Sequence, residues 1–115
     1  MEAARALADL VEISPQIEAA AVLAAGGEMA GSVGIPDARA TILTRAVREL
    51  LDGAAGFRSD AARVTQLHAT LSGGDVFAVA GGDERTILAV TQEGAAPGLV
   101  FYDLKQCLGR LRDET

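Results

Sequence analysis

The chain has few side chains suited to catalysis, and the first to consider is its single cysteine, Cys107. A cysteine nucleophile needs a neighbouring base, and the only histidine is His68. Cys107 lies in a segment with helical apolar spacing, where an unpaired cysteine is typical of a small core residue. We therefore expect no nucleophilic catalysis, and we expect His68 at a surface or an interface rather than at a site of proton transfer.

Sites for metals and nucleotides also lack their usual residues. One cysteine and one histidine, with no helical or hairpin spacing between them, do not make a structural zinc site. The segment Gly31–Gly34 lacks the third glycine of a dinucleotide-binding loop, and no Gly-Lys-Ser or Gly-Lys-Thr occurs. The paired acids Asp83–Glu84 and Asp113–Glu114 fall in a turn and at the chain end, where water solvates them. We predict no metal, no cofactor and no catalytic residue, and so a protein that is not an enzyme.

Length and charge limit the partners and the number of domains. The chain has 115 residues and a net charge of -6, from 16 acidic and 10 basic residues, which does not suit nucleic acid or an anionic membrane surface. The longest stretch without Asp, Glu, Lys or Arg, Val64–Gly74, is far shorter than the roughly 20 residues that cross a bilayer. We expect one domain over residues 1–115, no membrane span and, since no secretory leader pattern is present, a cytoplasmic location.

Apolar periodicity and glycine turns divide the chain into helices and strands. The first helix is expected to bury Ala4, Leu7, Ala8 and Val11, which share one face. The expected elements are, in order, a helix over Glu2–Ile13, a hairpin of Ile17–Ala24 and Glu28–Val33, a long helix over Asp37–Ala55, a meander of Ala62–Leu71, Val76–Ala80 and Arg85–Thr91, and a terminal helix with Val100, Leu104, Cys107, Leu108 and Leu111 on one face.

The long helix has a broader apolar side than packing on one sheet requires. At 100° per residue, the apolar residues fill about half of its circumference, whereas a single packed surface needs a stripe of a little over 100°. Ile42 and Ala46 lie at one border of this arc, and Leu51 lies toward the other. We predict that the surplus packs against a second helix, either from this chain or from another copy.

Three motifs indicate a family. They are the pattern A-x-V-L-A-x-G-G-x-x-A at Ala20–Ala30, the sequence GGDVF at Gly73–Phe77, and the sequence GLVFYDL at Gly98–Leu104. With the order of elements, these segments resemble the roadblock/dynein light chain family, and within it the bacterial MglB-like regulators of small GTPases. The resemblance covers nearly the whole chain and rests on pattern more than on invariant residues.

The resemblance implies a non-catalytic scaffold. Its fold would be an α/β protein of the α+β, profilin-like type, with a five-stranded antiparallel sheet, the long helix on one face and the N- and C-terminal helices on the other. Family members usually form homodimers by pairing the long helices and the adjoining edge strands, which here are Asp37–Ala55 and Ala62–Leu71.

Two sets of site residues follow for a homodimer with a protein partner. The dimer interface is expected to include Ile42, Ala46, Val64, Gln66 and His68, with Leu51 as the alternative border of the helix. The partner surface is expected on the polar side of the long helix, at Thr41, Arg45, Arg48, Glu49 and Asp52. The competing interpretation of these five residues is a solvated face held by Arg45–Glu49 and Arg48–Asp52 pairs. Should the partner bind elsewhere, the strand face bearing Gln66, His68 and Thr70 is the next candidate.

The leading hypothesis for function is a homodimeric regulator that binds a small Ras-like GTPase and alters its activity or localisation without donating a catalytic group. One alternative is a profilin-like sensory domain that encloses a small molecule, which the low aromatic content of 3% disfavours. Another alternative is a structural adaptor with no GTPase partner. A GTPase that co-purifies with the chain would distinguish these hypotheses.

Overall fold

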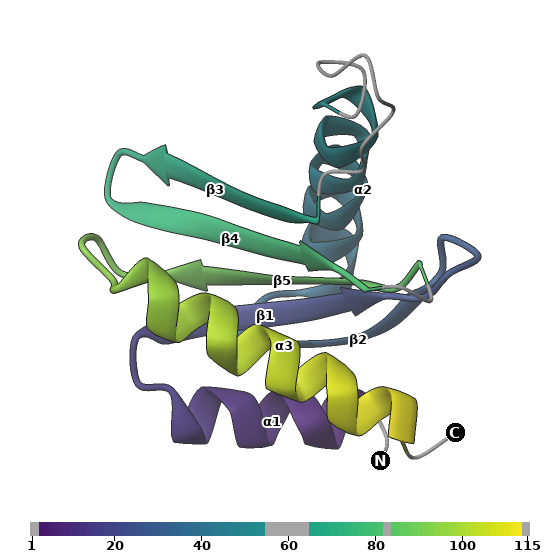
Figure 1. Ribbon diagram of the computed structural model, residues 1–115, viewed down its shortest axis with the longest axis horizontal. Helices are drawn as coiled ribbons and strands as arrows, with labels where there is room; N and C mark the ends of the chain where they lie inside the picture. Colours follow the sequence, from purple (N-terminus) through teal and green to yellow (C-terminus); the bar gives the residue numbers. More distant parts are fainter. Residues whose placement is uncertain (1–2, 55–64, 82–83, 114–115) are drawn as a thin grey trace.

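The computed structural model describes residues 3–54, 65–81 and 84–113, which form a five-stranded antiparallel sheet between two helical layers (Figure 1). The strands lie in the order β2-β1-β5-β4-β3. The elements are α1 (Ala3–Ile13), β1 (Ile17–Leu23), β2 (Met29–Val33), α2 (Asp37–Ala54), β3 (Gln66–Leu71), β4 (Gly74–Ala80), β5 (Thr86–Thr91) and α3 (Pro97–Asp113). The predicted fold class is therefore confirmed, with α2 on one face of the sheet and α1 and α3 on the other.

Strand β1 is rich in alanine because helices pack on both faces of the sheet beside it. Ala20 belongs to the apolar cluster beneath α1 and α3, and its neighbour Ala21 belongs to the cluster beneath α2. Both are fully buried, since successive strand residues point to opposite faces. Small side chains on each face allow both helical layers to approach the sheet closely.

Helix α1 is rotated relative to the predicted face. It buries Ala6, Leu7 and Leu10, whereas Ala4 and Ala8 are exposed. The helix packs both on the sheet and on α3, so the larger Leu10 is buried in preference to the alanines. None of the described helices is long and apolar enough to cross a membrane.

The connection from β2 to α2 depends on Gly34. Its φ is +78°, and a Cβ at this position would lie 2.5 Å from the Glu18 carbonyl oxygen, so a larger residue would force the backbone apart. Just before it, the Ser32 hydroxyl donates a hydrogen bond to Asp37 Oδ1 (2.6 Å) at the start of α2. These contacts fix the direction in which α2 leaves the sheet.

Cys107 lies fully buried on α3, as its helical spacing predicts. Its thiol donates to the Ala6 carbonyl of α1 (3.7 Å). Burial raises the pKa of the Cys107 thiol, and the nearby positive charge of Arg110 opposes that shift. A buried thiol whose pKa is raised is a poor nucleophile.

Candidate functional site

Helix α2 crosses β1, β2 and β5 and presents three different faces. Its inner face buries Ala40, Thr44, Val47 and Leu51 against the sheet, and the Thr44 hydroxyl is satisfied by the Ala40 carbonyl (2.8 Å). Leu51 packs in the cluster beneath its own helix, so the alternative border proposed for dimer contact was wrong. The physical reason is that the sheet lies on the Leu51 side of the helix.

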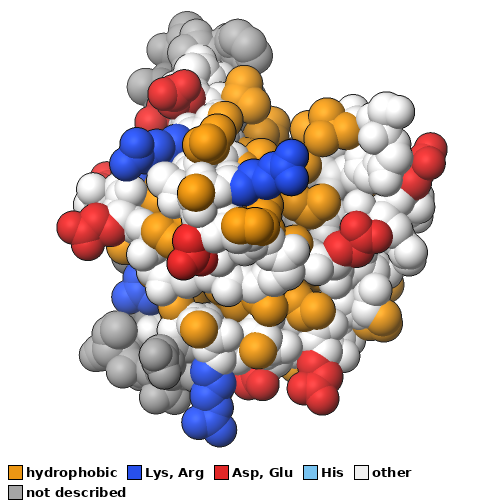
Figure 2. Space-filling model, turned by 180° about the vertical axis from the view of Figure 1, so that it is seen from behind, with side chains coloured by type: hydrophobic (Ala, Val, Ile, Leu, Met, Phe, Trp, Pro, Cys, Tyr) orange, Lys and Arg blue, Asp and Glu red, His pale blue; other side chains and the backbone are white. Residues whose placement is uncertain are grey.

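The second face of α2 is apolar and exposed. Ile42 is 71% exposed, Leu50 is 57% exposed, and Ala46 lies between them at helical spacing. On the same side of the sheet, Leu67 and Ala69 of β3 are only partly buried. We call these five residues the apolar face; Figure 2 looks onto this side of the molecule, where hydrophobic side chains gather on and beside α2.

Strand β3 is an open edge of the sheet, because it pairs only with β4. The Ala80 N–H donates to the Thr65 carbonyl (2.9 Å), which directs the backbone groups of alternate residues from Thr65 onward toward β4. The intervening backbone groups, those of Gln66, His68 and Thr70, therefore point outward, free to pair with another strand. Val64, which the sequence placed at the same edge, lies outside the described residues.

His68 is held in a defined position on the α3 side of β3. Its ring stacks on Phe77 with centroids 4.2 Å apart, and Nε2 lies 2.9 Å from Asp75 Oδ2. The His68 side chain remains 30% exposed, in keeping with a surface position. The partner Asp75 was missed by sequence analysis, although the turn after Leu71 makes positions 68 and 75 diagonal neighbours across the hairpin.

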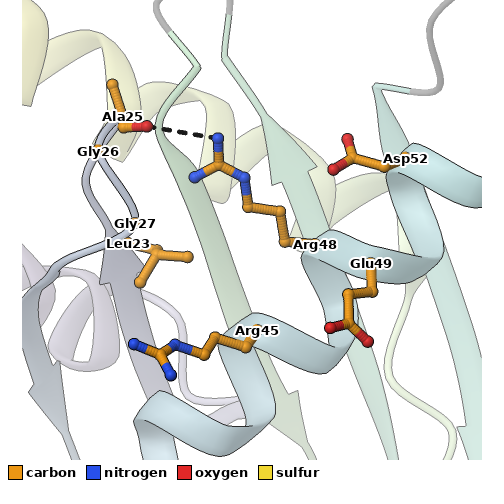
Figure 3. Close-up of a pocket in the computed structure, with 8 residues that line it drawn as sticks. All are labelled: Leu23, Ala25, Gly26, Gly27, Arg45, Arg48, Glu49 and Asp52. Atoms are coloured by element: carbon orange, nitrogen blue, oxygen red, sulfur yellow. Dashed lines mark hydrogen bonds between the residues drawn. The ribbon is translucent and has the colours of Figure 1, made fainter.

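The third face of α2 is polar and borders a cleft. It is lined from the helix by Arg45, Arg48, Glu49 and Asp52, and from the other side by Leu23 at the end of β1 and by Ala25, Gly26 and Gly27 of the β1–β2 turn (Figure 3). The volume of this cleft, which we call the hairpin cleft, is about 330 Å³. Four of the five predicted partner-binding residues thus lie together at one cleft. The fifth, Thr41, donates its hydroxyl to the Asp37 carbonyl (2.9 Å).

The two arginines of the cleft do not form the predicted pairs within α2. Arg48 instead donates hydrogen bonds to the Ala24 and Ala25 carbonyls of the turn (3.4 and 3.3 Å). Arg45 has no hydrogen bond or ion pair within the part of the chain that the structure describes. The predicted Arg45–Glu49 and Arg48–Asp52 pairs are therefore not formed among the described residues, and for Arg48 the reason is that the turn supplies carbonyl acceptors that spacing along the helix cannot reveal. Arg45, Glu49 and Asp52 are exposed, as a solvated face requires.

A second groove lies on the opposite layer. It has a volume of about 240 Å³ between α1 and α3, where Ile13 and Tyr102 leave apolar surface exposed. Across residues 3–54, 65–81 and 84–113, no three His, Cys, Asp or Glu side chains gather as a metal site would require. Among the described residues, two surfaces are therefore the candidates for binding. They are the apolar face, which lies beside the open edge of β3, and the hairpin cleft with its charged side chains.

Comparison with known proteins defines the class of fold. No family model matches the sequence, and no curated protein matches it. Solved structures do match: a roadblock/LC7 domain from Streptomyces avermitilis has a TM-score of 0.84 at 17% identity, over 96% of this chain and 94% of that one. The chain has an α+β, profilin-like roadblock fold.

Within that class, the likeness extends to MglB. Myxococcus xanthus MglB has a TM-score of 0.78 at 13% identity, over 96% of this chain and 84% of that one. A further MglB structure, described as having a tetrameric arrangement, has a TM-score of 0.73 at 14% identity, over 91% of this chain and 81% of that one. The predicted resemblance to MglB-like roadblock proteins is confirmed at the level of the fold.

Proposed function

We propose that this protein is a non-catalytic homodimeric regulator that binds a small Ras-like GTPase and modulates its activity or localisation. The observation that carries the proposal is the arrangement of α2, which has an apolar face beside an open strand edge and a polar face around a cleft. One face suits a second copy of the chain, and the other suits a different protein.

The apolar face supports the dimer. Burying Ile42 and Leu50 removes large apolar side chains from water, which contributes roughly 1.5–3 kcal/mol for each fully buried side chain. A second copy related by two-fold symmetry presents the same surface, and its β3 satisfies the outward backbone groups of this β3. The tetrameric arrangement of an MglB structure supports self-association of this fold.

The polar face supports the GTPase partner. Joining two chains along α2 places two copies of Arg45 and Arg48 on one assembly, and arginine is enriched among residues that dominate binding energy at interfaces. We expect a stoichiometry of two chains to one GTPase. The cytoplasmic location that such a partner requires is part of the proposal.

Reversing the charge at the cleft tests the partner surface. We expect Arg45→Glu/Arg48→Glu to raise the Kd for the GTPase at least about 30-fold, since losing charged contacts in a desolvated interface costs about 2–5 kcal/mol. Binding is measured by calorimetry with a purified small Ras-like GTPase from the same organism. Circular dichroism and light scattering check that fold and mass are unchanged.

The matched control is Arg5→Glu/Lys105→Glu, which makes the same change in net charge at exposed residues of α1 and α3. This variant should bind as the original does. If the cleft variant and the original bind the GTPase with equal affinity, the partner binds elsewhere. The strand face of Gln66, His68 and Thr70 is then the next candidate. A dimer that binds no GTPase would instead favour the structural adaptor.

A further inference from the structure

The imidazole of His68 turns one ring face toward the open edge of the sheet, which β3 forms in Figure 1. His68 and Phe77 are direct partners across β3 and β4, and their rings stack with centroids 4.2 Å apart and planes 10° from parallel. The stack therefore runs across the strands, and the other face of the imidazole is directed away from β4. Since β3 pairs only with β4, no described strand covers that face, and the side chain is 30% exposed.

Asp75 holds the ring in this orientation. Asp75 is 5% exposed, and its Oδ2 lies 2.9 Å from His68 Nε2, which donates a hydrogen bond to the carboxylate. The other oxygen, Oδ1, is buried and has no hydrogen-bond partner among the described residues, so the bond from His68 is the one that compensates this carboxylate there. Turning the ring outward would break that bond. The exposed ring face is therefore fixed at the edge of the sheet.

The outward backbone groups of β3 favour one register with an identical strand. They belong to Gln66, His68 and Thr70. In an antiparallel pair of two copies, a two-fold axis beside His68 sets Gln66 opposite Thr70 of the second copy and sets His68 opposite its own equivalent. All three residues are then paired. An axis one residue away, at Leu67 or Ala69, pairs only two of the three within β3.

A second copy of the chain is the occupant of this edge that the described residues favour. The outward groups of β3 find their complement in the same three residues of an identical strand. On the opposite side of the strand, Leu67 and Ala69 are only partly buried and belong to the apolar face. A copy paired along β3 would therefore cover the strand edge and the apolar face together.

We propose that the two-fold axis of the homodimer passes beside His68, so that the exposed faces of the two imidazoles meet and the dimer weakens on acidification. Residues opposite each other in such a pair lie about 5.5 Å apart at Cα, which lets the two rings continue the stack that begins at Phe77. The inference rests on the homodimer of the proposed function. It adds the register of the two strands and a group that responds to pH.

Protonation of His68 opposes this contact. An imidazole gains its charge between about pH 8 and about pH 5. In the dimer the ring loses water from its exposed face and meets a second ring of the same charge, and both effects disfavour the protonated form. Within residues 3–54, 65–81 and 84–113, Asp75 of β4 is the charged side chain that pairs with His68, and it does so in the monomer already. The dimer thus binds fewer protons than two monomers, and its Kd should rise as the pH falls.

The first experiment measures the dimer Kd by sedimentation equilibrium at about pH 7.5 and about pH 5.5, on either side of the usual imidazole titration. His68 is the only histidine in the chain, and we expect the Kd to rise at least about tenfold at the lower pH. His68→Gln keeps an amide donor for Asp75 but does not titrate, so its Kd should change less than about twofold. Circular dichroism at both pH values checks that the chains stay folded.

A double variant, His68→Phe/Asp75→Asn, removes the titrating ring and the buried charge together while keeping an aromatic ring beside Phe77. Its dimer should also be insensitive to pH, and it decides the question if His68→Gln does not fold. A pH dependence that persists in either folded variant would overturn the role of His68.

Spin labels test the register by a separate measurement. Residues 66 and 70 lie equally far from the proposed axis, so nitroxides on Gln66→Cys and on Thr70→Cys should report equal distances between the two copies, about 15 Å at Cα. An axis at Leu67 or Ala69 would make the two distances differ by about 13 Å, at about 3.4 Å per residue. Both labelled positions are exposed, whereas the native Cys107 is fully buried; the unsubstituted protein checks that Cys107 takes up no label.

The outcomes separate this inference from the proposed function. A chain that is a monomer at about pH 7.5 would overturn both. A dimer whose Kd is the same at the two pH values, or whose two label distances differ as for a shifted axis, would overturn the placement of His68 while the homodimer stands.

Discussion

Replacing Leu104 with alanine should lower the free energy of unfolding by about 2–5 kcal/mol, the usual range for a leucine truncated in a packed core. Leu104 is fully buried in the cluster that joins α1 and α3 to the sheet. The truncated side chain leaves a cavity and also reduces the apolar surface that is buried on folding. Urea unfolding followed by circular dichroism measures the change. Since the whole stability of a domain is about 5–15 kcal/mol, this loss is large.

Leu99→Ala is the matched control on the same helix. Leu99 is 58% exposed, so its truncation should change the free energy of unfolding by less than about 0.5 kcal/mol. Similar losses for the two variants would mean that α3 packs on the sheet through a different face. The comparison therefore tests the orientation of α3 and not only the sensitivity of the fold to mutation.

Ile42→Glu should split the homodimer into folded monomers. The substitution places a charge within the surface that the second copy covers, and it costs the monomer little because Ile42 is 71% exposed. Light scattering at micromolar concentration should report the mass of two chains for the original and the mass of one chain, 11.8 kDa, for the variant. Circular dichroism should be the same for both.

Ile13→Glu provides the control for a surface isoleucine. Ile13 is 60% exposed on α1, in the layer opposite α2, so this variant should keep the mass of the dimer. Dissociation by Ile13→Glu together with an intact Ile42→Glu dimer would place the interface on the α1 and α3 layer instead.

The strands and turns could be predicted because their signals are local. Glycine pairs mark the β1–β2 and β3–β4 turns, and alternation is visible in β3. The buried side of α1 was predicted wrongly, because Ala4 and Ala8 have helical spacing and were treated as equal to leucine in the prediction. Leu10 is buried because α1 packs against both the sheet and α3. The periodicity of α1 alone does not reveal its contact with α3.

The polar face of α2 was predictable as a set, since residues at 100° spacing share one side of a helix. Its contacts were not predictable. Arg48 reaches carbonyls of the β1–β2 turn, which is distant from it in the sequence, and these acceptors replace the expected bond to Asp52. Leu51 was offered as a dimer contact because spacing alone does not say which part of a wide apolar arc meets the sheet.

The most direct test of the proposed function is the mass of the protein mixed with a small Ras-like GTPase from the same organism. The GTPase is loaded with a non-hydrolysable GTP analogue, and the mixture is followed by size-exclusion chromatography with light scattering. We expect one complex whose mass equals that of two chains plus one GTPase. A chain that elutes with the mass of a single copy, with the GTPase eluting separately at its own mass, would contradict both the homodimer and the regulatory function.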